Sequence, residues 1–167
     1  TYQLIFAKAL FLNGNLSEHQ IKLQEIDELI SQRNKLFPSS SDNKYSFNFL
    51  PFYRNYLLQK AKHFHFNEQF VEADECFNDV LQRSSQLYGS NHPIVYEIIH
   101  EQLTSMTIRG SDNLDNLMTS IDNNLKNLEG YYSKEHPMII QSIYLFTTFC
   151  LMYRSEDMNL MRLCQTE

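Results

Sequence analysis

The sequence predicts an all-α protein made of antiparallel helix pairs, with about seven to eight helices in total. Three observations lead to this prediction. Only four Gly and four Pro occur in 167 residues, too few for a β-sandwich or barrel that turns about every ten residues. Apolar residues recur with the period of a helix along most of the chain. A Tyr-x-x-x-His-Pro segment occurs twice, 44 residues apart, and such a fixed period is typical of helical repeats.

The first helix pair is expected over residues 2–36. Its first helix covers 2–12, where apolar residues follow helical spacing. Ser17 is predicted to be the N-cap of the second helix, because Ser with Gln20 three residues later forms a capping-box pattern. Pro38 and the three serines after it then predict a loop.

The second pair, expected over residues 49–87, carries the strongest repeat signal. Its first helix is predicted to end at Phe66, and Asn67 is predicted to be the N-cap of the next helix. Ala61 and Ala73 are small residues that are expected to lie where the two helices cross, since only small side chains let helix backbones approach closely.

The two His-Pro segments predict the starts of the third and fourth pairs, over residues 93–128 and 137–167. Pro93 and Pro137 are each expected at the first helical position, where the missing N–H costs nothing. The last helix of the fourth pair is expected to start near Ser155. These boundaries place all four pairs in one domain, residues 1–167.

Shifting the second pair by 44 residues aligns it with the later pairs. Ala61 aligns with Ser105 and then with Phe149, and Ala73 aligns with Leu117. The later crossings are therefore expected to be wider, because larger side chains keep two helices further apart.

These residues resemble the long tetratricopeptide repeats of kinesin light chains. In that family an extended second helix ends in a Tyr-Gly-x-x-His-Pro corner, as Leu87–Pro93 does here, and the resemblance covers roughly residues 49–153. It implies a short right-handed solenoid whose first helices line a concave groove. Lys60 departs from the family pattern, which usually has Leu there. The Lys/Asn clamp that some members use on carboxyl-terminal peptides is not reproduced.

The layout is also similar to the C-terminal helical domain of SET-and-MYND lysine methyltransferases. The segments that can be placed on that domain are Leu36–Pro38, Val71-Glu72-Ala73, His92-Pro93 and Glu135-His136. No part of the sequence matches the catalytic SET domain or the zinc-binding MYND module. If this second resemblance holds, the active site of the enzyme lies outside the given sequence.

The first resemblance implies that the chain is a scaffold or adaptor that binds another protein along the concave helix surface. The predicted groove residues are Asn55, Leu58, Lys62, His65 and Phe66 from the best-matched repeat, Gln102, Met106 and Arg109 from the next, and Phe146, Tyr153 and Arg154 from the third. Their mixture of aromatic and cationic side chains suits an acidic, hydrophobic peptide. The alternative is that the apolar members are packing residues and the cations are ordinary solvated side chains.

No pattern in the sequence predicts an enzyme, a metal site or a cofactor. His63 and His65 fall on opposite faces of a helix and cannot share a metal ion by themselves. His92 and His136 are expected to cap or hydrogen-bond the turn of each corner. Cys76 falls on an apolar stripe, where a buried thiol is inert. Acidic pairs such as Asp27-Glu28 are interpreted as solvated helix faces.

Composition limits the class of partner and the location. A net charge of −6 argues against an electrostatic nucleic-acid interface, and no apolar run is long enough to span a membrane. Three cysteines without a CxxC pair fit a reducing compartment, so an intracellular location, cytoplasmic or cytoskeletal, is expected. Both ends fall inside apolar helical patterns, which predicts that the sequence is part of a longer chain.

Overall fold

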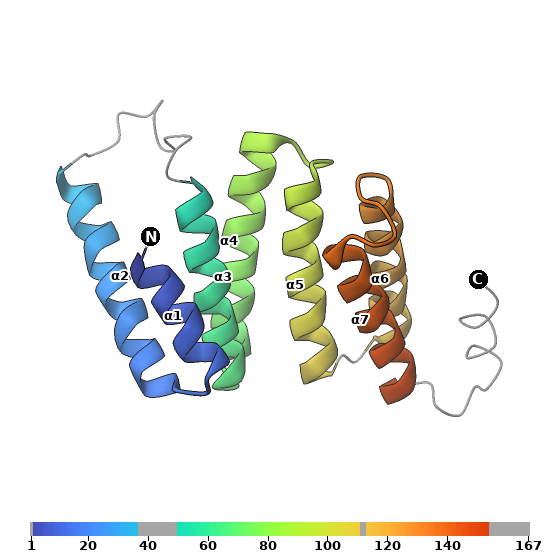
Figure 1. Ribbon diagram of the computed structural model, residues 1–167, viewed down its shortest axis with the longest axis horizontal. Coiled ribbons are helices and arrows are strands. Elements are labelled where there is room, and N and C mark those ends of the chain that lie inside the picture. The colour runs from blue at the N-terminus through green and yellow to red at the C-terminus, as the bar shows by residue number, and fades with distance from the viewer. Residues whose placement is uncertain (1, 37–49, 111–112, 154–167) are drawn as a thin grey trace. The chain divides into compact units, whose positions relative to one another are not determined.

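The computed structural model describes residues 2–36, 50–110 and 113–153, and within these ranges it contains seven α-helices and no β-strand (Figure 1). The helices are α1 Tyr2–Leu12, α2 Leu16–Leu36, α3 Leu50–Phe66, α4 Phe70–Tyr88, α5 Pro93–Arg109, α6 Leu114–Glu129 and α7 Pro137–Tyr153. The prediction of an all-α chain with about seven to eight helices is confirmed. The predicted loop after Pro38 and the predicted helix near Ser155 lie outside the described residues.

Contacts between residues group the chain into two compact units, Thr1–Leu87 and Tyr88–Glu167. The assignment of residues 1–167 to one domain stays a prediction. In the first unit α1, α2 and α3 contact one another, and in the second unit α5, α6 and α7 do the same. Successive helices within each unit run in opposite directions (Figure 1). Each unit therefore contains an antiparallel pair against which the first helix of the next pair packs.

The turn between α1 and α2 explains where α2 begins. Gly14 has a left-handed backbone (φ 74°), and the amide of Asn15 donates to the carbonyl of Leu10 at 2.9 Å, a Schellman ending that favours Gly. The Asn15 side chain then accepts from the amide of Glu18 at 3.5 Å. The N-cap is therefore Asn15, and the prediction of Ser17 at this position is wrong, because the turn leaves only Asn15 between Gly14 and the first residue of α2, Leu16.

The turn after α3 is also a Schellman ending, but its left-handed position is occupied by a residue other than Gly. Glu68 adopts a left-handed backbone (φ 61°), and the amide of Gln69 donates to the carbonyl of Phe64 at 2.9 Å. Asn67 belongs to this ending, where its side chain donates to Nε2 of His63 at 3.0 Å. The prediction that Asn67 caps α4 is wrong, since the turn needs three residues before α4 can begin.

The two Tyr-x-x-x-His-Pro corners have the same geometry. Tyr88 stacks on His92 with ring centroids 4.9 Å apart, and Tyr132 stacks on His136 at 4.0 Å. In both corners Nδ1 of the histidine accepts from the backbone amide two residues later at 3.2 Å, and the next residue is the proline that opens α5 or α7. The predicted capping role of the two histidines is confirmed, because each one satisfies an amide that the new helix leaves unpaired.

Residues that are 44 positions apart in the repeat are buried alike. Ala61, Ser105 and Phe149 occupy equivalent positions and are all buried, and so are Ala73 and Leu117. These equivalent residues therefore belong to the cores of their units, although their side chains differ greatly in volume.

The core of the second unit is one continuous cluster. It is formed by the buried side chains of Leu103, Leu117, Ile121, Leu145 and Phe149, which come from α5, α6 and α7. Because all three helices contribute to the same apolar cluster, its burial is the main force that holds them together.

Ala73→Leu should destabilise the first unit by about 1–3 kcal/mol, because Ala73 is fully buried on α4 and three extra carbons would overfill its surroundings. Urea denaturation followed by circular dichroism measures this loss. Val71→Leu is the matched control on the same helix, since Val71 is exposed. No measurable loss for Ala73→Leu would show that the repeat register is wrong.

Candidate functional site

The predicted groove residues of the first unit differ in exposure. Asn55 and Phe66 are exposed, whereas Leu58, Lys62 and His65 are half-buried. The His65 ring lies 5.4 Å from the ring of Phe70 at the start of α4. His65 therefore takes part in packing between the two helices of its own pair.

The predicted groove residues of the second unit are used largely in packing. Met106, Phe146 and Tyr153 lie against the core cluster, and the Tyr153 hydroxyl donates to the carbonyl of Thr107 at 2.9 Å. The remaining members are half-buried Gln102 and Arg109, and Arg154, which lies outside the described residues. Since the predicted members belong to both units, the groove as a whole stays a prediction.

A buried histidine pair joins α2 to α3 in the first unit. Nδ1 of His19 lies 3.1 Å from Nδ1 of His63, and both side chains are buried. The sequence analysis missed this pair, because helical periodicity assigns a residue to a face but does not name the residue opposite. A signal was present, since the two residues are 44 positions apart, the spacing of the His-Pro corners.

The hydrogen bonds of the pair fix the proton positions. Because the Asn67 side chain donates to Nε2 of His63, we assign the proton of His63 to Nδ1, which donates to Nδ1 of His19. His19 then carries its own proton on Nε2, which has no hydrogen-bond partner within the described part of the chain. The pair is therefore one directed chain of hydrogen bonds that ends in an unsatisfied donor.

Burial keeps both rings neutral. It lowers the pKa of His19 to about 4, with repulsion from His63 as a second cause, and it lowers the pKa of His63 as well. Neutral imidazoles are good metal ligands. However, no group of three or more His, Cys, Asp or Glu side chains that could hold a metal ion occurs among the residues that the structure describes. The pair is best understood as a buried polar link between two helices.

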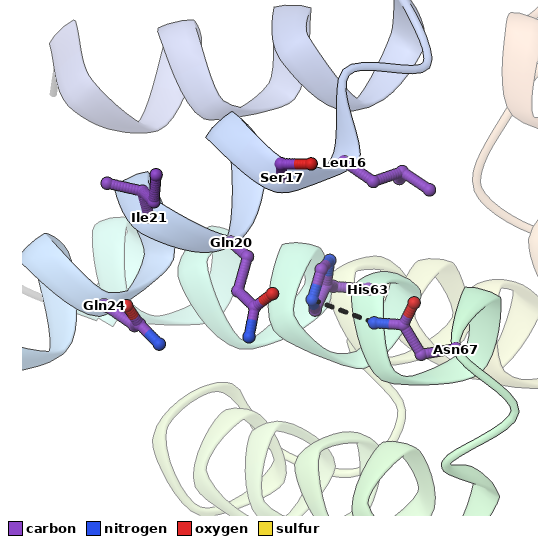
Figure 2. Close-up of a pocket in the computed structure, with 7 residues that line it drawn as sticks. All are labelled: Leu16, Ser17, Gln20, Ile21, Gln24, His63 and Asn67. Atoms are coloured by element: carbon purple, nitrogen blue, oxygen red, sulfur yellow. Dashed lines mark hydrogen bonds between the residues drawn. The ribbon is translucent and has the colours of Figure 1, made fainter.

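An open pocket of about 470 Å³ lies beside this pair (Figure 2). It is lined by Leu16, Ser17, Gln20, Ile21, Gln24, His63 and Asn67. Figure 2 shows Gln20 reaching from α2 towards α3, next to His63. Apart from the imidazole of His63, the polar side chains that line the pocket are three amides and a hydroxyl, which can hydrogen-bond a neutral ligand. Nε2 of His63 already accepts from Asn67 and is therefore not available as a general base.

A second polar cluster joins the same two helices. The Tyr56 hydroxyl donates to Asp27, and Nζ of Lys60 lies 2.9 Å from the other carboxylate oxygen of Asp27. Burial, followed by this hydrogen bond, raises the pKa of Tyr56. The Asp27 side chain is still 44% exposed, so it lies on a partly solvated face, as predicted, and also binds these two residues of α3. The contact also accounts for Lys60 at a position where the resembling family has Leu, because Lys60 is the cation of this cluster.

Cysteine chemistry is limited by burial. Cys76 is buried on α4, and burial is the main cause that raises the pKa of its thiol to about 11. The thiol is thus protonated at neutral pH, which supports the prediction of an inert side chain. Cys150 is half-buried, and Cys164 lies outside the described residues.

The largest exposed apolar surface on one helix of the second unit lies on α7. Its 17 residues include no charged side chain, yet five large apolar residues are about half exposed or more. They are Ile140, Ile143, Tyr144, Leu151 and Met152. A helix that is apolar on all faces is normally buried, so this surface is unusual for a helix in contact with water.

Comparisons with protein families, with curated proteins and with solved structures found no match to this chain. Within the described ranges, no helix combines the length and the apolar character needed to cross a membrane.

Proposed function

We propose that the chain is a helical-repeat scaffold that binds another protein through an apolar stripe on α7. The stripe consists of Ile140, Tyr144 and Leu151, which are 55%, 73% and 53% exposed. Their spacing places them within about 40° of one another around the helix. Exposed apolar patches of this kind mark protein-interaction sites. The absence of any charge from α7 is the observation that carries the proposal.

The equivalent stripe on α5 supports this assignment. His100 and Thr107 lie 44 residues before Tyr144 and Leu151, and both are buried. Nδ1 of His100 is 3.1 Å from the Ser142 hydroxyl, and the carbonyl of Thr107 accepts from the Tyr153 hydroxyl. Both contacts are made by α7. Two of the three equivalent positions on α5 therefore pack against a helix, and the stripe on α7 suits a helix that a partner protein supplies.

The proposed partner presents an amphipathic helix. Apolar residues at intervals of three or four positions on such a helix would meet Ile140, Tyr144 and Leu151 in the manner of a helix in a groove. The stripe offers no charge for an ion pair, so its affinity comes from burial of apolar surface. This is a role in binding rather than in catalysis, and it suits an intracellular subunit or adaptor of a larger complex.

A photo-cross-linking amino acid at position 144 tests the proposal. Exposed to cell extract and light, it should form a covalent adduct with another protein, whereas the same probe at exposed Asn123 on α6 should not. Leu151→Asp should remove the adduct, because a carboxylate would be buried in an apolar contact. An adduct that persists in Leu151→Asp, or no adduct at position 144, would contradict the proposal.

A further inference from the structure

The pocket between α2 and α3 is lined by groups that match an amide. Side-chain amides come from Gln20, Gln24 and Asn67, and no Lys, Arg, Asp or Glu within the described part of the chain belongs to the lining. An amide carries a donor and an acceptor in one plane, so it can pair with the same two groups on a ligand. The volume of about 470 Å³ lies within the range of small-molecule sites, about 300–1,000 Å³.

The buried histidine pair determines how Asn67 faces this pocket. Nδ2 of Asn67 lies 3.0 Å from Nε2 of His63, and Nδ1 of His63 lies 3.1 Å from Nδ1 of His19. With the proton of His63 used on His19, Nε2 can only accept, and a reversed amide would bring the Asn67 oxygen against it. Figure 2 shows the Asn67 nitrogen directed at His63 and the oxygen on the other branch of the amide. Because Asn67 is exposed, this oxygen is an acceptor that a ligand can reach.

The α2 side of the pocket supplies a donor and an apolar surface. Gln20 reaches from α2 towards α3, next to His63 (Figure 2), and its NH2 group can donate to a carbonyl oxygen. Leu16 and Ile21 line the same pocket, and Ile21 is 53% exposed. An alkyl group placed against these two side chains would be removed from water, which favours binding.

We infer that this pocket binds a neutral amide that carries a small alkyl group. The ligand N–H donates to Oδ1 of Asn67, the ligand carbonyl accepts from Gln20, and the alkyl group packs on Leu16 and Ile21. A charged ligand is disfavoured, because it would lose hydration without gaining an ion pair from the lining. A peptide bond beside an apolar residue and a small free amide share the required chemistry.

Titration of the 167-residue chain with N-methylisovaleramide, followed by NMR of the side-chain amides, tests this inference. The NH2 signals of Gln20 and Asn67 should shift, and those of Asn78 should not, since Asn78 is exposed on α4 and does not line the pocket. Methyl isovalerate is the matched probe, because an ester oxygen replaces the N–H and would face Oδ1 of Asn67 without a hydrogen bond. The ester should bind at least about tenfold more weakly than the amide.

Asn67→Leu should weaken binding of N-methylisovaleramide at least about tenfold, because it keeps the shape of the side chain and removes the acceptor. Asn78→Leu is the matched control and should leave the affinity unchanged. Circular dichroism of both variants checks that the helices remain. The comparison of amide with ester uses the unaltered chain, so it tests the inference even if Asn67→Leu does not fold.

A third probe, N-acetylleucine methylamide, separates the two sources of the amide. Binding at least about threefold tighter than that of N-methylisovaleramide would identify a peptide chain as the ligand, and equal or weaker binding would identify a small free amide. Three results would overturn the inference: no shift of the Asn67 signals, equal affinity for amide and ester, or binding unchanged in folded Asn67→Leu. The cross-linking at position 144 concerns the other unit, so the proposed function can fail independently.

Discussion

Lowering the pH from about 7.5 to about 4.5 should reduce the free energy of unfolding of the first unit by about 3 kcal/mol. The cause is the buried pair of His19 and His63. Burial lowers the pKa of His19 from 6.5 to about 4, and a fall of that size corresponds to about 3 kcal/mol in favour of the neutral form.

The direction of this change in the free energy of unfolding follows from proton uptake. Between pH 6.5 and about 4 the unfolded chain binds a proton at His19 and the folded chain does not, so the free energy of unfolding falls with the pH. The lowered pKa of His63 acts in the same direction. Geometry gives the same result, because a proton added to Nδ1 of His19 would face the N–H of His63 and remove the hydrogen bond between them.

Urea denaturation across this pH range, followed by circular dichroism, measures the effect. The double variant His19→Leu/His63→Leu should lose the acid sensitivity and keep nearly the same stability at neutral pH, because both partners and the unsatisfied Nε2 donor are removed together. His63→Leu alone should cost about 1–3 kcal/mol at neutral pH, since it leaves His19 buried without a partner. His65→Gln is the control that leaves the pair intact. Acid sensitivity that survives in the double variant would exclude the pair as its cause.

Helix positions in this chain could be predicted from the sequence because local signals specify them. Proline at the first helical position fixes the starts of α5 and α7, and both helices begin at the predicted Pro93 and Pro137. The corner histidines were also predicted as capping groups. Their contacts reach only two residues along the chain, so they depend on little beyond the local sequence.

Contacts between helices could not be predicted in the same way. The Asp27–Tyr56–Lys60 cluster joins residues about 30 positions apart, and periodicity alone cannot say that an acidic residue of α2 faces a lysine of α3. For the same reason, periodicity could not separate the members of the predicted groove from packing residues. Met106, Phe146 and Tyr153 have the side chains of a binding surface, but they pack on the core of their own unit.

The wrongly predicted N-caps show a third reason why parts of the structure could not be predicted from the sequence. Ser17 with Gln20 is a good capping pattern, yet Asn15 takes the position because α2 begins at Leu16, two residues after the left-handed Gly14. Several polar residues near a helix start can each serve as a cap, and the backbone of the preceding turn decides between them.

Phe149→Ala should destabilise the second unit by about 3–5 kcal/mol, although it restores a small residue of the kind found at the equivalent repeat positions. Those positions are Ala61 and Ser105, both buried, and a comparison of repeats alone would suggest that alanine is tolerated. The packing indicates the opposite. The Phe149 ring is fully buried, lies in the cluster shared by α5, α6 and α7, and is 5.3 Å from the ring of Tyr153.

The loss in Phe149→Ala has two parts, the transfer of the ring to water in the unfolded chain and the cavity left in a core that relaxes only partly. Urea denaturation gives the size of the loss, and hydrogen exchange of the amides in α5 and α7 assigns it to the second unit. Tyr144→Ala is the matched control, because Tyr144 is an exposed aromatic residue of the same helix and its truncation should change the stability by only about 0.5 kcal/mol. A loss below about 1 kcal/mol for Phe149→Ala would mean that the third repeat closes around a small residue as the first two do, and the core cluster would then not be what holds α7 in place.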